Sequence, residues 1–328
     1  MIQKINEISD VWRFINQLSD SRIGFLNSDK VLCIYEGRIK EKLLENRVEI
    51  AEEWRGGYLI NETHFYSKGK LEPLFVENIY KILIVDNEQL LVKFIDYEEE
   101  EIKYGLFDFS LKSIKWLPDF VGARPRMLLK QRNLISSNDK AIKSYSIIES
   151  NFWQQSFTDI TDTEKAILHS QILHGHDKLF FVLTGFEDKG LYVLDVATGK
   201  LLKHFKGLAY ELFQEGDYIY TTRFQNILCR VNTQTLEIEE WNCHELLTKH
   251  GIRSIHDHRC AAKEGKFYFT QSIGDTKAKM GILDWESKEL IYQHDFEPKN
   301  GAIGSIQVGV GRFFVHTQDN TLHIFVEE

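Results

Sequence analysis

The chain has 328 residues, 43% of them hydrophobic and 27% charged, which is typical of a globular protein with a core and excludes a disordered chain. Its formal net charge of −9 argues against nucleic acid or an anionic membrane as a partner and favours a basic protein. No stretch approaches 18 uncharged apolar residues, and the charged first twenty residues do not resemble a secretory signal, so we expect no membrane span.

The first predicted element is an amphipathic helix within residues 1–20. Its apolar residues recur at spacings of three and four, namely Ile2, Ile5, Ile8, Trp12, Ile15 and Leu18. We expect this helix to pack on the rim or over one mouth of the β-rich domain that follows.

From residue 21 onward the chain predicts a series of short strands. In the first half the clearest pair is YKILIVD at Tyr80 with YGLFDF at Tyr104, and weaker strands begin near Gly56 and Arg126. In the second half, strands rich in aromatic and β-branched residues start at Leu179, Tyr218, Phe267 and Phe313, with spacings of 39, 49 and 46 residues. This regular spacing predicts one supersecondary unit that is used many times.

A recurring turn supports the repeat. An Asp or Asn ends a strand, a Thr or Ser follows three residues later, and an apolar strand restarts at the sixth position, as seen from Asp195, Asn232 and Asp284. Asp108 begins a similar segment with the hydroxyl displaced by one residue. Asx side chains bond backbone N–H groups two or three residues ahead, so we interpret these residues as turn formers and not as catalytic carboxylates.

The spacing and the turns together resemble the β-propeller repeat superfamily, whose blades run ~40–50 residues. The segment LYVLDVATGKLL (Leu191–Leu202) is similar to the repeat of quinoprotein-type propellers. The resemblance implies a single all-β domain of about seven four-stranded blades, with six or eight also open. Exported quinoprotein dehydrogenases carry a signal and a repeated tryptophan that this chain lacks, and we expect no cofactor.

The last predicted blade lacks a fourth strand, because the sequence ends soon after Thr321–Phe325. Propellers close by borrowing such a strand from the other terminus, which removes an exposed edge. We therefore expect residues 21–328 to form the propeller, closed by an N-terminal strand that pairs with residues 310–326. The segment Arg22–Tyr35 is the most direct candidate for that strand.

Two histidine-rich segments are candidates for a site. His174 and His176 precede the predicted strand at Leu179, and His256 and His258 precede the predicted strand at Phe267, with Cys260 close by. In a propeller, the segments that enter equivalent strands of successive blades lie on one face. We therefore expect both histidine groups to lie around one mouth of the channel. Imidazole and thiolate are ordinary zinc ligands, which makes these five residues metal candidates. Structural histidines are nevertheless the favoured interpretation, since neither a C-x-x-C nor an H-E-x-x-H spacing is present.

Nearby arginines extend this candidate site. The predicted binding residues are His174, His176, Arg253, His256, His258 and Arg259. A mouth lined by histidine and arginine would receive an acidic side chain or a small anion. The sequence predicts no catalytic residue, because it has no G-x-S-x-G, P-loop or dinucleotide-binding turn.

Two charged runs lie in the first half. The acidic run Tyr97–Glu101 is expected to be a solvated hairpin tip. The basic residues Arg124, Arg126, Lys130 and Arg132 would suit a phosphate or an acidic partner. Without interleaved aromatic residues they are weak support for nucleic-acid binding.

These observations leave two function classes open. The favoured one is a non-enzymatic, monomeric platform that binds a partner protein, for example an immunity protein that neutralises a basic effector. The alternative is an enzyme with its site in the central channel, either a sugar hydrolase or lyase or a metal-assisted hydrolase. The four cysteines, Cys33, Cys229, Cys243 and Cys260, are few and widely spaced, which suits a reducing compartment, and we expect a cytoplasmic protein.

Overall fold

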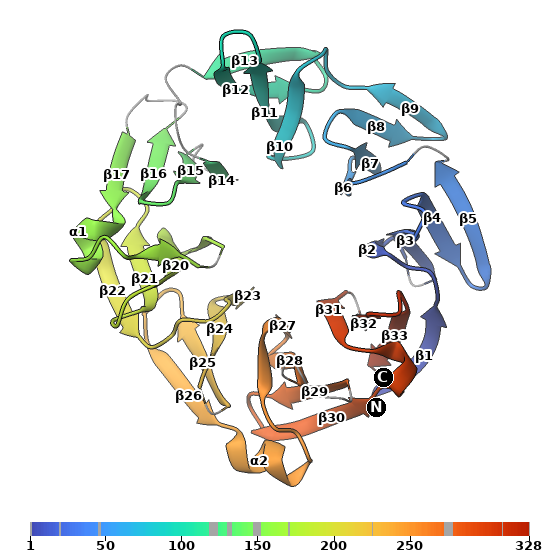
Figure 1. Cartoon of the computed structure of the whole chain (residues 1–328), viewed down its shortest axis with the longest axis vertical. Helices are drawn as coiled ribbons and strands as arrows, with labels where there is room; N and C mark the ends of the chain where they lie inside the picture. Colours follow the sequence, from blue (N-terminus) through green and yellow to red (C-terminus); the bar gives the residue numbers. More distant parts are fainter. Residues whose placement is uncertain are drawn as a thin grey trace. The chain divides into compact units, whose positions relative to one another are not determined.

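Figure 1 shows the computed structural model of the chain, which describes residues 2–19, 21–44, 47–117, 124–129, 133–146, 152–169, 171–224, 226–271, 278–309 and 311–327. The chain divides into two compact units. Unit 1 consists of Met1–Asp10 and Gln155–Glu328, and unit 2 consists of Val11–Gln154. Antiparallel strands dominate both units, which confirms the prediction of an all-β chain.

Unit 2 contains four sheets in which strands that follow one another in the chain are neighbours. The first sheet is β2 (Arg13–Gln17), β3 (Arg22–Leu26), β4 (Leu32–Glu36) and β5 (Ile39–Leu44). The second is β6 (Ala51–Trp54), β7 (Gly57–Ile60), β8 (His64–Ser67) and β9 (Lys70–Pro73). The third is β10 (Ile79–Ile84), β11 (Gln89–Asp96), β12 (Glu101–Asp108) and β13 (Ser113–Leu117). The fourth is β14 (Arg124–Leu128), β15 (Asn133–Ser137), β16 (Ala141–Ser146) and β17 (Phe152–Ser156), whose last residues belong to unit 1.

Unit 1 also contains four sheets. The first is β18 (Ile167–Leu168) and β19 (Leu173–Gly175), which both pair with β20 (Lys178–Thr184), followed by β21 (Gly190–Asp195) and β22 (Leu201–Lys206). The second is β23 (Phe213–Glu215), β24 (Tyr218–Arg223), β25 (Ile227–Asn232) and β26 (Ile238–Asn242). The third is β27 (Ile255–Lys263), β28 (Lys266–Gln271), β29 (Lys279–Asp284) and β30 (Glu289–Asp295). The fourth is β31 (Ile303–Val308), β32 (Arg312–Thr317), β33 (Leu322–Glu327) and, from the other end of the chain, β1 (Ile2–Ile8).

The helices of the described residues are short. They are α1 (Phe157–Thr161), α2 (His244–Lys249) and the 3-10 turn η1 (Pro298–Asn300). None of these described helices has the length and apolar character that crossing a bilayer requires.

Neighbouring sheets within each unit pack face to face through apolar side chains. In unit 1, Phe180 of one sheet shares a buried core with Ile219 of the next. In unit 2, Trp54 shares a core with Leu90 in the same way. Alternating strand positions supply these contacts, because successive side chains of a strand point to opposite faces.

The described strands form eight sheets, one more than the estimate of about seven and within the range left open. The difference comes from the short blades of the first half. The sheet β6–β9 has strands of only four residues and occupies residues 51–73, well below the assumed blade length of ~45 residues.

The recurring turn has the predicted hydrogen bonds. Each acidic or amide oxygen accepts the N–H group three residues ahead, at 2.8 Å for Asp195 and Asp284 and at 2.9 Å for Asn232 and Asp108. The interpretation of these residues as turn formers is therefore confirmed.

The amphipathic helix predicted for residues 1–20 is wrong, because Ile2–Ile8 and Arg13–Gln17 are strands. The spacing of three between Ile2, Ile5 and Ile8 suits a helix, but it arises here from a strand with an extra residue in its register. A register shift between Lys4 and Asn6 leaves Ile5, the intervening apolar residue, 44% exposed.

The strand that completes the last sheet is β1 and not the segment Arg22–Tyr35. β1 pairs antiparallel with β33, from Ile2 opposite Glu327 to Ile8 opposite Leu322 (Figure 1). Arg22–Tyr35 instead forms the hairpin β3–β4 in unit 2. The pairing of two strands five residues apart closes a short loop, which costs less chain entropy than a pairing with the far end of the chain.

A buried histidine lies at this junction. His323 on β33 is fully buried and stands opposite Glu7 of β1. Its Nε2 is 3.0 Å from the Thr317 hydroxyl, whereas its Nδ1 lies 3.7 Å from the Glu7 carboxylate, too far for a hydrogen bond. Burial, and next the positive charge of Lys4, lower the pKa of His323 to about 4.

We expect acid to weaken the fold through His323. Its folded pKa lies below the unfolded value of about 6.5, so the unfolded state binds the proton first and stability falls as the pH drops from 6.5 toward 4. Protonation linked to His323 lowers the free energy of unfolding by about 2–3 kcal/mol at pH 4.5, and this effect vanishes above pH 7. In chemical unfolding, the free energy of unfolding of His323→Phe should fall less with acid than that of the wild type. His250 is exposed, and His250→Gln should follow the wild type. Parallel profiles for wild type and His323→Phe would contradict this account.

Candidate functional site

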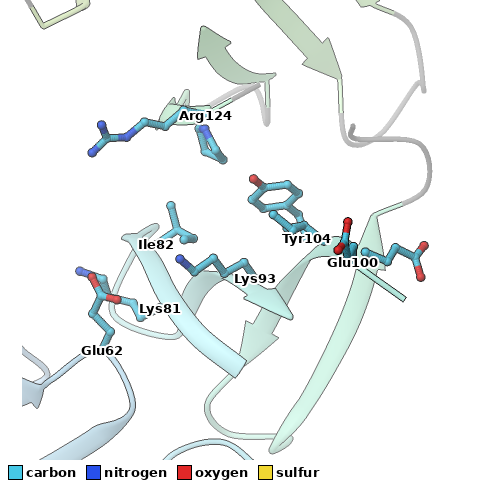
Figure 2. A pocket seen from close by; sticks show the side chains of 10 residues that line it. Glu62, Lys81, Ile82, Lys93, Glu100, Tyr104 and Arg124 are labelled. Carbon is cyan, nitrogen blue, oxygen red and sulfur yellow. The ribbon is translucent and has the colours of Figure 1, made fainter. Parts of the chain in front are cut away.

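The described residues of unit 2 include a pocket of about 770 Å³ (Figure 2). Three sheets contribute to it: the β7–β8 turn of the second, strands β10 to β12 of the third, and the start of β14 in the fourth. The lining residues are Glu62, Lys81, Ile82, Lys93, Glu100, Glu101, Ile102, Tyr104, Arg124 and Pro125. The wall is thus partly cationic, partly acidic and partly apolar.

Register shifts in β10 and β14 affect how the side chains of these strands are oriented. The pairing of β10 with β11 shifts register between Lys81 and Leu83, which leaves Ile82 as the extra residue of a bulge. Pro125 lies on β14, the first strand of its sheet, where a missing N–H group removes no ladder bond on the open side. A second register shift follows directly, between Pro125 and Met127.

The three cations of the pocket differ in their partners. The Lys81 ammonium is buried and pairs with the carboxylate of Glu52 on β6. Lys93 lies over the ring of Tyr80, with its Nζ 5.5 Å from the ring centroid. Among the described residues, neither Lys93 nor Arg124 has an ion-pair partner.

The acidic part of the wall comes mainly from the β11–β12 hairpin. Glu101 pairs with Lys103 at 2.8 Å, and Glu100 occupies the turn with a φ of 51°. Figure 2 shows Arg124 across the pocket from Lys93, with Glu100 beyond the ring of Tyr104. Burial raises the pKa of Tyr104, so its hydroxyl stays protonated at neutral pH.

The predicted binding residues lie in unit 1, and the first two sit at a turn. His174 on β19 faces Leu179 across the ladder, and burial lowers its pKa. His176 follows in the β19–β20 turn with a φ of 45°, and its Nε2 lies 2.8 Å from Asp217 in the β23–β24 turn. This pair joins the turns of two neighbouring sheets.

The second predicted group lies on β27, where the register shifts between Ile255 and Cys260. His256 is buried, and its Nδ1 accepts the N–H group of His258 at 3.1 Å. The Cys260 thiol donates to the His256 carbonyl at 2.9 Å. These bonds hold the wide bulge in place.

The two arginines of the predicted site contact different segments of unit 1. The Arg259 guanidinium donates to the Ile303 carbonyl of the next sheet. Arg253 is exposed in the segment before β27, where its carbonyl accepts from the Asn226 side chain at 2.9 Å.

The convergence of the two histidine groups at one mouth stays a prediction. His258 lies in the bulged part of β27, five residues before its end, whereas His176 lies in the β19–β20 turn. His258 neighbours His169, at 5.8 Å between ring centroids, and Glu211, at 3.5 Å from Nδ1.

The proposed metal ligands are not assembled. In the part of the chain that the structure describes, no three His, Cys, Asp or Glu side chains are grouped so as to hold a metal ion. His174, His176, His256, His258 and Cys260 therefore do not form the ligand set that the sequence suggested.

No family model and no curated protein matches the sequence. Solved structures do resemble the fold. BamB from Moraxella catarrhalis aligns with a TM-score of 0.61 at 11% identity, covering 100% of this chain and 98% of its own. Sqt1 from Saccharomyces cerevisiae aligns with 0.63 at 9% identity, covering 99% and 98%. The computationally designed Ika8 protein aligns with 0.59 at 11% identity, covering 97% and 96%.

The chain is a β-propeller. At these identities the likeness concerns the fold alone. No family model supports the finer likeness to quinoprotein-type repeats.

Two of the segments that line the pocket of this propeller stand out in the sequence as charged runs, but the pocket itself was not predicted. The acidic run Tyr97–Glu101 does form a hairpin tip, and Arg124 begins the next sheet's first strand. Lys130 and Arg132 of the basic run lie outside the described residues. The sequence does show an acidic hairpin followed by a basic residue at the start of the next sheet. It does not show the strand register that brings Lys93 to the same wall.

Proposed function

We propose that this protein is a non-enzymatic binding protein that holds a segment of a partner protein in the pocket of unit 2. The pocket itself carries this proposal. Its volume of about 770 Å³ falls within the range of ~300–1,000 Å³ typical of ligand sites. Its wall combines apolar side chains with charged groups, which suits a polypeptide segment better than a purely apolar ligand.

The fold supports this proposal. A propeller presents turns and strand ends on stiff antiparallel sheets, and binding residues are commonly carried on such positions. Ile82, Ile102 and Pro125 offer apolar contact, and Tyr104 adds an aromatic ring with a hydroxyl donor.

A neutralising role toward a basic effector is a finer form of the same proposal, supported by the net charge of −9. It requires that capture of the partner weaken steeply with added salt. A cytoplasmic location belongs to the proposal as well, and it is consistent with the four buried free thiols of the described residues.

The proposal is tested by a charge placed on the apolar wall of the pocket. Ile102 is 47% exposed and lines the pocket, so Ile102→Glu should leave folding intact and reduce recovery of the partner at least tenfold. The assay is capture from a lysate of cells that make the protein, followed by mass spectrometry of the bound proteins.

Ile39→Glu is the matched control, because Ile39 is 63% exposed on β5 of the same unit and does not line the pocket. Its recovery of the partner should equal that of the wild type. Equal capture by the two variants, with both melting as the wild type does, would refute a role for the pocket.

A further inference from the structure

We propose that the pocket of unit 2 recognises a carboxylate side chain in the partner's segment, held between Lys93 and Arg124, with apolar residues on either side of that carboxylate. This inference rests on the proposed function and names the chemistry of the partner.

The three cations of the pocket are unequally paired. Lys81 is neutralised by Glu52, so its charge needs no further partner. Lys93 and Arg124 come from β11 and β14 and have no ion-pair partner among the described residues. Two cations that share a concave wall attract an anion, since low-dielectric walls strengthen their field.

Arg124 also repels Arg126, which lies beside the pocket. Arg126 is partly buried, and its Nε donates to the Ser137 hydroxyl at 2.7 Å. Burial lowers the pKa of Arg126, and the positive charge of Arg124 lowers it further. A carboxylate bound at Arg124 would offset this repulsion, and guanidinium groups bind carboxylates with two parallel hydrogen bonds.

The acidic side chains of the pocket limit how many acidic residues the bound segment can carry. Glu100 and Glu62 also line the pocket, and Glu101 is already paired with Lys103. A second carboxylate close to the hairpin would meet Glu100, which Figure 2 places beyond the Tyr104 ring from the two cations. The site therefore favours one acid with apolar neighbours over a polyacidic tract.

The apolar neighbours have their own contacts. Ile82 stands at the bulge of β10, and Ile102 on β12 and Pro125 on β14 line the same pocket. Burial of a leucine-sized side chain against them adds affinity that a free inorganic anion cannot gain.

The test uses a fluorescein-labelled pentapeptide, Ser-Leu-Asp-Leu-Ser, capped at both ends, and its twin with Asn in place of Asp. Fluorescence anisotropy with the full chain should show at least tenfold tighter binding of the Asp peptide. The double variant Lys93→Gln/Arg124→Gln should remove this preference. The control Lys68→Gln/Lys70→Gln, which changes the net charge equally in the same unit, should keep it.

Equal binding of the two peptides, absence of binding, or a preference that survives Lys93→Gln/Arg124→Gln would overturn the inference. Competition by inorganic phosphate at the same concentration as the Asp peptide would overturn it too, because it would indicate a small-anion site. If Ile102→Glu loses the natural partner while Lys93→Gln/Arg124→Gln retains it, the inference fails and the proposed function stands. If both variants retain the partner, both fail.

Discussion

Removal of residues 1–10 is expected to abolish the cooperative thermal transition of the full chain. These residues carry β1, which supplies the fourth strand of a sheet whose core includes Phe313 and Phe325, two rings stacked at 4.7 Å. Without β1, the N–H and C=O groups of β33 face solvent or another chain along an open edge. We expect the truncated protein to associate and to melt without a single transition, as measured by calorimetry and light scattering.

Two point variants on β1 separate strand loss from chain shortening. Ile8 is 3% exposed and Ile5 is 44% exposed on the same strand. Ile8→Asp should destabilise the protein by about 3 kcal/mol or more, because it buries a charge without a partner, whereas Ile5→Asp should cost less than about 1 kcal/mol. A truncated protein that stays monomeric and melts near the wild-type temperature would contradict the closing role of β1.

The second large effect is expected for Trp285→Ala. Trp285 is 2% exposed and packs edge-to-face on Tyr220 and Trp241, each at 6.1 Å between ring centroids. The cations of Arg230 and Lys288 lie over the indole ring at 4.6 and 3.5 Å. Removing the ring creates a cavity and leaves both cations without this contact, so we expect a loss of about 3–5 kcal/mol in chemical unfolding.

Trp116→Ala is the matched control for size and chemistry. Trp116 is 42% exposed on β13, so its removal opens no closed cavity and should cost about 1 kcal/mol or less. Similar losses for the two tryptophans would mean that the site of Trp285 relaxes to fill the space.

The repeat was predictable in the second half because local chemistry repeats there. Asp195, Asn232 and Asp284 each fix a turn through bonds to residues three positions ahead, which a sequence displays directly. The N-terminal strand was not predictable in this way. The isoleucines of residues 2–8 fit a helix or a strand, and the deciding factor is the open edge of β33, more than 300 residues away.

The pocket illustrates the same limit for function. Charged residues at Glu100 and Arg124 are visible in the sequence, but bulges in β10 and β14 decide which side chains reach the shared wall. The sequence showed that His176 and His258 precede strands, but not that His176 lies in the β19–β20 turn while His258 lies in the bulged part of β27.

The pairing of β1 with β33 has a consequence for synthesis on the ribosome. β1 is made more than 300 residues before its partner β33, so the fourth sheet of unit 1 cannot form until β33 has left the ribosome. During that interval β1 must avoid pairing with other nascent chains. Three of its four exposed positions, Gln3, Lys4 and Glu7, are polar or charged and Ile5 is the fourth, and this polar majority disfavours edge-to-edge association. Nascent chains stalled just before residue 322 should therefore hold β1 accessible to proteases, whereas released chains should protect it.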